Sequence, residues 1–120
     1  EDQISDLPGR LLAAEITREK LYLQLHQELP YAAAVETEGW KLKEDGSIKI
    51  DQIIYIERKS QKAIVLGRGG KRIKAIGEAA RKELEDLLKT RIHLFLFVKV
   101  RERWGDDPDR YRDLGLEFNA

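Results

Sequence analysis

A short stretch near the middle of the chain places glycines beside basic side chains. Residues 67–70 read Gly-Arg-Gly-Gly and stand directly before a predicted helix whose first turn contains Lys71 and Lys74. The first backbone N–H groups of a helix have no partners within the helix and lie at the positive end of its dipole, and glycines let an anion approach the main chain. The stretch therefore predicts an anion-binding site. The alternative is that Gly67 only ends a preceding helical turn and that surface lysines follow it.

The spacing of these residues decides which anion fits. A nucleoside triphosphate loop of the Walker A type would need Gly at position 65 and Ser or Thr at position 72, where the chain has Val65 and Arg72. A dinucleotide loop starting at Gly67 would need a small residue at the same position 72. Gly-X-X-Gly between two predicted helices instead matches the loop with which KH modules clamp about four unpaired nucleotides, which indicates single-stranded RNA. A small phosphate-bearing molecule at the same helix start stays open as an alternative.

The other polar side chains predict neither an active site nor a metal site. The chain has no cysteine and only two histidines, His26 and His93, which lie far apart in the sequence. Asp106, Asp107 and Asp109 do not match the spacing of a calcium loop, and helix capping around the neighbouring proline explains them. We therefore predict no catalytic residue, no metal ligand and no cofactor in this chain.

Charge is unevenly distributed along a chain of 120 residues whose net charge is zero. Residues 58–74 contain seven basic residues, Lys62 among them, and no acidic residue. A local basic field of this kind attracts a polyanion although the whole molecule is neutral. The sequence lacks both a run of about 20 apolar residues and a basic amino terminus followed by an apolar segment, so we expect a cytoplasmic domain.

Hydrophobic periodicity predicts two long helices, over residues 10–28 and 70–88. The first carries an apolar stripe at helical spacing, formed by Leu11, Ala14, Leu21, Leu25 and Leu29. The second carries another, formed by Ile73, Ile76, Ala80, Leu84 and Leu87. Gly77 inside the second helix predicts close packing against another backbone. Shorter helices are expected over residues 60–66, with Ser60 as the cap, and after Pro108 as far as Gly115.

Alternating apolar residues predict three strands. The first covers residues 35–42 and carries a bulge near Gly39, and an Asp45-Gly46 turn joins it to the second, over residues 48–56. The third covers residues 92–100 and places Phe95 and Phe97 on one face. Two helices between the second and third strands allow a crossover. We expect an α+β fold, with a three-stranded mixed sheet and the helices packed on one of its faces.

Several parts of the sequence together resemble a known domain. They are the string from Val65 to Gly77, Arg18-Glu19-Lys20-Leu21, Glu28-Leu29-Pro30-Tyr31, Ile56-Glu57-Arg58, and the stretch from Val98 to Trp104. With the expected order of elements, they resemble the carboxy-terminal type II KH domain of the Era-type family of Ras-like ribosome-assembly GTPases. The resemblance covers nearly the whole chain. It implies a linker from a GTPase domain over residues 1–10 and a KH RNA-binding domain over residues 11–120.

The resemblance also implies a function and a set of partners. The domain would bind the single-stranded 3′ end of small-subunit (16S-type) ribosomal RNA, on a 30S-type subunit, during ribosome assembly. It would act as a monomer tethered to the GTPase domain, which would bind GTP and Mg²⁺. The parent would then be a GTPase and this chain no enzyme, and peripheral association of the parent with the inner membrane stays open.

By the same resemblance, the residues that contact RNA include the glycine loop, nearby basic positions and apolar positions of the two flanking helices. They are Gly67, Arg68, Gly69, Gly70, Lys71, Lys74, Ile64, Val65, Ile73, Ile76 and Lys62. A KH-like protein-docking module without sequence-specific RNA binding is the alternative. Such a module would use Phe95, Phe97 and Lys99 on the exposed strand face instead of the glycine loop.

Overall fold

The computed structural model of the chain describes residues 2–29 and 34–101. Its elements are helix α1 (Asp2–Leu25), strands β1 (Ala34–Leu42) and β2 (Ile48–Ile56), helix α2 (Lys59–Leu66), a 3-10 turn η1 (Arg68–Gly70), helix α3 (Lys71–Leu88) and strand β3 (Ile92–Val100). The predicted order is confirmed as far as the third strand. The short helix predicted after Pro108 lies outside the described residues.

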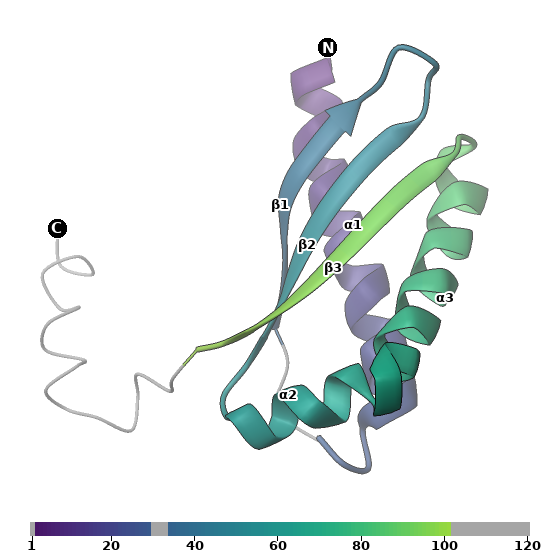
Figure 1. Cartoon of the computed structure of the whole chain (residues 1–120). Helices are drawn as coiled ribbons and strands as arrows, with labels where there is room; N and C mark the ends of the chain where they lie inside the picture. The colour runs from purple at the N-terminus through teal and green to yellow at the C-terminus, as the bar shows by residue number, and fades with distance from the viewer. Residues whose placement is uncertain (1, 30–33, 102–120) are drawn as a thin grey trace, which may run out of the picture.

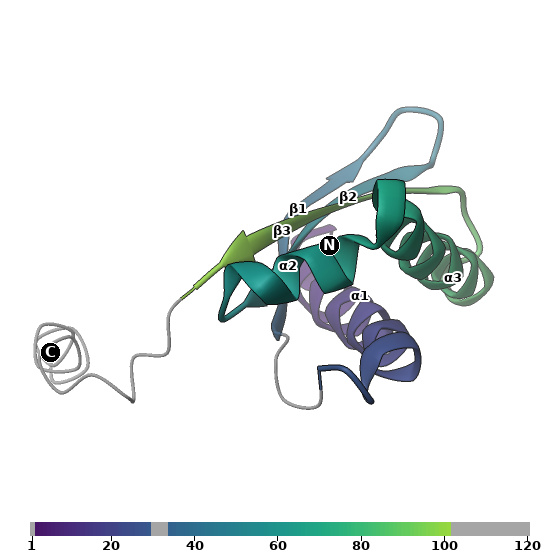
Figure 2. The same ribbon diagram turned by 60° about the horizontal axis from the view of Figure 1, so that its bottom comes forward.

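The three strands form one mixed sheet in the order β1-β2-β3. β1 pairs antiparallel with β2 and shifts register between Thr37 and Gly39, which confirms the predicted bulge. β3 pairs parallel with β2 and forms an edge of the sheet. Helices α1 and α3 lie side by side against one face, and α2 packs near the end of β3, so the predicted α+β arrangement is confirmed (Figures 1 and 2).

The core lies between the sheet and the helices, in two neighbouring clusters. One joins the first half of α1 to the last turns of α3, through Ala13, Ile16, Ile48, Ile50, Ala80, Leu84 and Ile92. The other lies below the glycine loop and contains Leu21, Leu25, Ile54, Ile56, Val65 and Ile76. Burial of these apolar side chains is the main force that holds the helices on the sheet.

A polar pair is buried between α1 and the middle of the sheet. The Thr17 hydroxyl donates to Oε1 of Gln52 at 2.6 Å, and Nε2 of Gln52 donates to the Thr37 hydroxyl at 3.2 Å. Thr37 in turn donates to the carbonyl of Arg10 at 2.8 Å. Because buried polar atoms need partners, these bonds fix the rotation of α1 against β1 and β2.

Helix α1 differs from its prediction in both start and register. It begins at Asp2 and continues through Pro8 and Gly9, whereas the predicted helix starts at residue 10. A Cβ atom on Gly9 would lie only 2.5 Å from the Trp40 indole, so the glycine makes room for this ring. The predicted stripe is wrong at Leu11, which is 60% exposed, because Ala13 and Ile16 face the sheet instead. Whether residues 1–10 connect to another domain stays a prediction.

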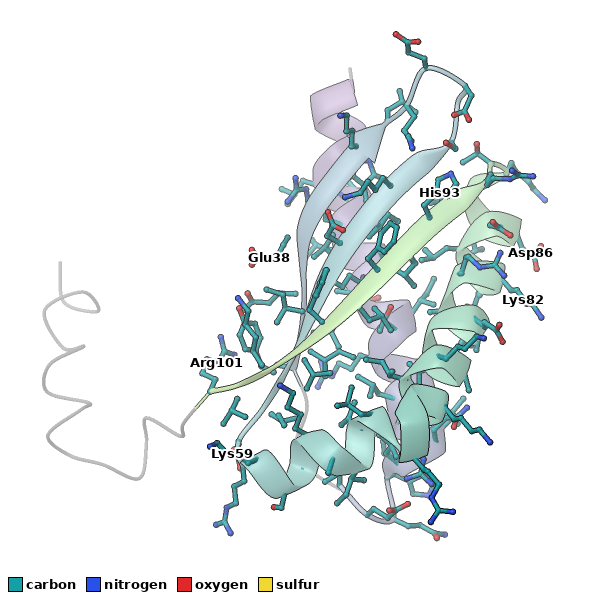
Figure 3. The ribbon with its side chains drawn as sticks, in the orientation of Figure 1. Glu38, Lys59, Lys82, Asp86, His93 and Arg101 are labelled. Carbon is teal, nitrogen blue, oxygen red and sulfur yellow. The ribbon has the colours of Figure 1, made fainter. Side chains whose placement is uncertain are left out.

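Helix α3 follows its prediction except near its end. Ile76, Ala80 and Leu84 are completely buried, whereas Leu87 is 53% exposed. Leu88 packs against the core in its place. Lys82 and Asp86 point away from the sheet, as an amphipathic helix requires (Figure 3). No helix among the described residues is long and apolar enough to cross a membrane.

Candidate RNA-binding loop and groove

The glycine loop joins α2 to α3 by a backbone path that requires glycine. Gly67 has φ 74° and ψ 174°, and Gly69 and Gly70 are both left-handed, with φ 63° and 75°. The Gly70 N–H donates to the Gly67 carbonyl at 3.1 Å and closes the turn. A Cβ atom on Gly67 would lie 2.6 Å from Cβ of Arg72, closer than side chains pack. The loop is therefore a defined turn and not merely the end of α2.

Helix α2, which precedes the loop, is fixed by hydrogen bonds at both of its ends. Oε1 of Gln61 accepts from the N–H groups of Glu57 and Arg58, at 2.8 and 2.9 Å, and so organises the start of α2. The prediction that Ser60 caps this helix is wrong, because Arg58 occupies the cap position. At the other end, the Gly67 N–H donates to the Ala63 carbonyl at 2.9 Å.

Helix α3 presents the features of an anion site at its first turn. Its cap residue, Gly70, has no side chain to bond the first N–H groups, and the first turn contains no acidic residue. Arg68, Lys71 and Lys74 are exposed around this turn and form no ion pair within the described residues. The loop therefore places the positive end of the α3 dipole beside these exposed cations, and the two together favour a phosphate.

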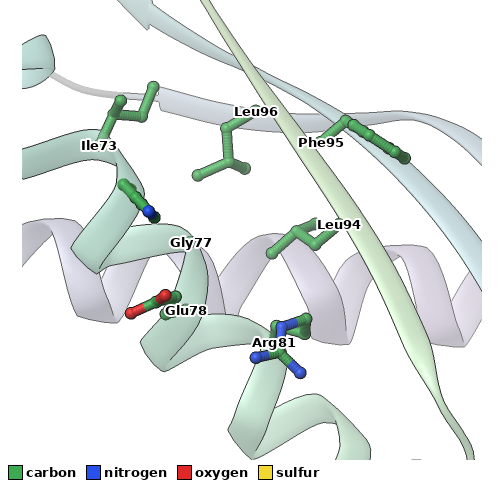
Figure 4. A pocket seen from close by; sticks show the side chains of 8 residues that line it. Ile73, Gly77, Glu78, Arg81, Leu94, Phe95 and Leu96 are labelled. Carbon is green, nitrogen blue, oxygen red and sulfur yellow. The ribbon is translucent and has the colours of Figure 1, made fainter. Parts of the chain in front are cut away.

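Beside the loop, a groove of about 300 Å³ runs between α3 and the edge strand β3 (Figure 4). Its walls are formed by Ile73, Lys74, Gly77, Glu78 and Arg81 of α3 and by Leu94, Phe95 and Leu96 of β3. A Cβ atom on Gly77 would lie 3.4 Å from Cδ1 of Leu96, so this glycine adjoins a side chain and not the predicted backbone. The groove is apolar in the middle and polar along α3, as a surface for bases would be.

The backbone of β3 contributes hydrogen-bonding groups to the same groove. The Arg91 carbonyl accepts from the Ile48 N–H, and the Arg101 N–H donates to the Ile56 carbonyl. Odd-numbered residues of β3 therefore direct their backbone N–H and C=O groups towards β2. Even-numbered residues such as Leu94 and Leu96 consequently direct their N–H and C=O groups towards the sheet edge. An edge strand with this geometry can pair with the polar edges of bases.

The structure separates the apolar site candidates into two roles. Ile64 and Ile73 are half-buried and border the hollows on either side of the loop. Val65 and Ile76 are completely buried in the core below the loop, so the prediction that they contact RNA is corrected. Their side chains face inward because α2 and α3 must each bury one stripe, and they support the loop from beneath.

A second hollow lies on the α1 side of the loop. It measures about 490 Å³, and Gln24, Ala63, Ile64, Gly67, Arg68, Lys71, Arg72 and Ala75 line it. Arg72, one of these lining residues, pairs with Glu28 at 3.0 Å and ties the turn that follows α1 to α3. Lys62 is exposed on α2 and lines neither hollow.

Several groove residues were not predicted from the sequence. Glu78 and Arg81 form part of the wall on α3, and the weak signal for them was their position one and two turns after Lys74 on the same helix. Oε1 of Glu85 pairs with Arg81 at 3.1 Å, while its Oε2 accepts the Ile92 N–H at 3.0 Å. This backbone bond, and then the nearby Arg81 charge, hold the pKa of Glu85 below its ordinary value. Glu85 thereby connects the groove wall to the start of β3.

The other polar candidates lie away from the loop. His26 stacks on Tyr22 with 4.8 Å between ring centroids, and its Nδ1 lies 2.8 Å from the Tyr22 carbonyl. His93 lies in the sheet, in register with Lys49. Within the described residues, no group of three or more His, Cys, Asp and Glu side chains could hold a metal ion. Asp106, Asp107 and Asp109 lie outside the described part of the chain.

The sequence of this chain matches a known domain family and known proteins. The sequence model of the KH domain family matches residues 28–105. GTPase Era of Mesorhizobium japonicum is 70% identical, and GTPase Era of Brucella suis biovar 1 is 67% identical, each over 118 residues that cover 98% of this chain and 38% of the relative. The chain therefore spans well under half the length of these relatives.

Two solved structures share the fold. A crystal structure of an Aquifex aeolicus Era variant bound to GDP and aluminium fluoride superposes with a TM-score of 0.75 and 38% identity. A crystal structure of Era in complex with MgGDPNP and nucleotides 1506–1542 of 16S ribosomal RNA gives the same values. Each match covers 86% of this chain and 35% of the other.

Proposed function

This chain belongs to the KH domain family, and we propose that it binds an unpaired segment of small-subunit ribosomal RNA, near the 3′ end, during ribosome assembly. The main support for the proposal is the position of the α3 start, which has a glycine turn, exposed cations and no side-chain cap. It lies directly beside the apolar groove between α3 and β3. The similarity to Era, one structure of which contains nucleotides 1506–1542 of 16S ribosomal RNA, supports this choice of ligand.

The binding mode follows from the two surfaces. The backbone of the RNA passes over the loop formed by residues 67–70, where the positive end of the α3 dipole and the Arg68 side chain meet phosphate oxygens. Lys71 and Lys74 supply charge on either side of this point. The bases then enter the groove, where Ile73, Leu94 and Leu96 meet their faces and the outward backbone groups of β3 meet their edges.

A single-stranded ligand fits this arrangement better than a duplex does. The groove is bounded on one side by α3 and on the other by β3, so only unstacked bases can reach the backbone of β3. A mononucleotide would occupy the anion site at the loop but leave most of the groove walls without contacts. The proposal therefore requires affinity to rise as the strand lengthens from one to about four nucleotides.

The rest of the parent protein is proposed from its relatives. Because the chain spans only 38% of Era-type relatives, we place GTP, Mg²⁺ and GTP hydrolysis in the remaining part. The chain itself contributes RNA binding and acts as a monomeric domain tethered to the GTPase. Its site of action would be the 30S-type subunit in the cytoplasm.

Fluorescence anisotropy tests the proposal. A labelled single strand from nucleotides 1506–1542 is titrated with the wild-type chain and with Lys71→Glu/Lys74→Glu, and a scrambled strand and a duplex serve for comparison. Lys41→Glu/Lys43→Glu is the matched control, because it changes the charge equally on two exposed lysines of the distant β1–β2 hairpin.

We expect tight binding of the matched strand to be lost in the loop variant and retained in the hairpin variant. Three to four phosphate contacts predict a slope of log affinity against log salt of about −2 to −3. Equal binding of all three ligands would instead indicate a nonspecific basic patch. Equal loss in both variants would show that net charge, and not the loop, governs the interaction.

A further inference from the structure

The face of the sheet opposite the helices carries aromatic side chains that the loop and groove do not explain. Phe95 and Phe97 of β3 are 46% and 53% exposed, and Tyr55 of β2 lies beside them on the same face. The helices cover only the other face, as Figures 2 and 3 show. No helix among the described residues packs on these rings.

Cationic groups surround the rings. Nζ of Lys49 lies 5.3 Å from the centroid of the Phe95 ring, and the Arg101 guanidinium lies 4.0 Å from that of Tyr55. Lys99, in register with Tyr55, is exposed and forms no ion pair in the described part of the chain. Phe97 therefore remains the ring with an open face, and cations lie next to it.

The acidic groups on this face are largely neutralised. Asp51 pairs with Lys49 at 2.9 Å, and Glu36 pairs with Arg101 at 3.5 Å. The remaining charge near Phe97 is thus the Lys99 ammonium. An aromatic ring with a free cation on an open sheet is the surface on which single-stranded nucleic acids stack their bases.

The face is continuous with the groove. Phe95 belongs to both, because it also borders the groove between α3 and β3. Phe97 follows two residues later on the same edge strand, about 6.6 Å further along it. A strand whose bases lie along the edge of β3 therefore passes within reach of Phe97 when it continues around this edge.

We propose that the open sheet face is a second subsite for the same single-stranded RNA, in which a nucleotide flanking those in the groove stacks its base on Phe97 and places its phosphate near Lys99. The inference rests on the proposed RNA-binding function. It extends the RNA contact from the groove to the other side of β3, so that stacking on Phe97 adds a nucleotide to the segment that the domain recognises.

Two RNA strands test the subsite. The first is the shortest piece of nucleotides 1506–1542 that the wild-type chain still binds, and the second extends it by three nucleotides at each end. Affinities are measured for wild type, Phe97→Ala, Phe97→Tyr and Leu23→Ala. Leu23 is the matched control because it is an apolar side chain, 61% exposed, on α1.

We expect the wild type to bind the extended strand at least about fivefold more tightly than the short one, as stacking on one ring predicts. Phe97→Ala should lose this gain while keeping its short-strand affinity, and Phe97→Tyr and Leu23→Ala should keep the gain. A gain that persists in Phe97→Ala, or is absent in wild type, overturns the subsite and leaves this face to a protein partner. If the wild-type chain binds no piece of nucleotides 1506–1542, the proposed function is overturned, and the subsite with it.

Discussion

Replacing Gly67 by alanine tests whether the glycine turn is as constrained as the structure indicates. The backbone at Gly67, φ 74° and ψ 174°, is one that essentially only glycine adopts, and holding another residue there costs about 1–3 kcal/mol. The added Cβ would also lie 2.9 Å from the backbone nitrogen of Arg72, in the first turn of α3. Since a backbone atom cannot move aside as a flexible side chain does, α3 itself must shift, which adds about 1–3 kcal/mol.

Gly69→Ala is the matched control. Gly69 is also left-handed, with φ 63°, but a Cβ atom there would meet nothing within 4 Å. Its substitution should therefore cost only about 1 kcal/mol, the left-handed penalty alone. Urea unfolding followed by circular dichroism measures both free energies of unfolding. The Gly67 variant should be less stable than the Gly69 variant by about 1–5 kcal/mol, and equal stabilities would refute the packing argument.

Three further substitutions test other contacts. Thr17→Val removes the buried hydroxyl that bonds Gln52 and should lower the free energy of unfolding by about 1–3 kcal/mol. Thr17→Ser, which keeps the hydroxyl, should cost less, and the reverse order would contradict the role of this bond. Glu85→Gln should lower stability at pH 7 and lower it less at pH 3. The lowered pKa of Glu85 means that its carboxylate stabilises the fold above the ordinary value of 4.5, an effect lost as the pH falls through the folded-state pKa. An equal loss of unfolding free energy at both pH values would contradict this role of the Glu85 carboxylate. Glu28→Gln frees Arg72 beside the loop and should tighten RNA binding by about 1.5- to 5-fold at low salt, less at high salt. Unchanged anisotropy titrations at low salt would show that this ion pair does not limit binding.

The loop and the strands were predictable because their signals are local. Glycines directly before an amphipathic helix specify a turn and an open helix start, whatever lies elsewhere in the fold. The alternation of side chains over residues 92–100 likewise specified the two faces of β3, one towards the helices and one outward, the latter with Phe97. Each of these predictions depends on neighbours within a few residues.

The parts that could not be predicted depend on contacts between distant segments. The helix was predicted to start at residue 10, after Pro8 and Gly9, but α1 begins at Asp2 and continues through both residues, and the Trp40 ring packs where a Cβ of Gly9 would lie. The periodicity that marked Ile76 as apolar could not say that it faces the core and not a ligand. Glu78 and Arg81 became groove residues only through the position of β3 beside α3.

The central claim is that one strand of RNA contacts both the glycine loop and the edge of β3. NMR spectra of the ¹⁵N-labelled chain, titrated with the single strand from nucleotides 1506–1542, test this claim residue by residue. We expect the amide signals of residues 67–71, Leu94 and Leu96 to shift together, with one common affinity. Shifts that leave these amides unchanged and appear elsewhere, for example on the outer face of α1, would contradict it.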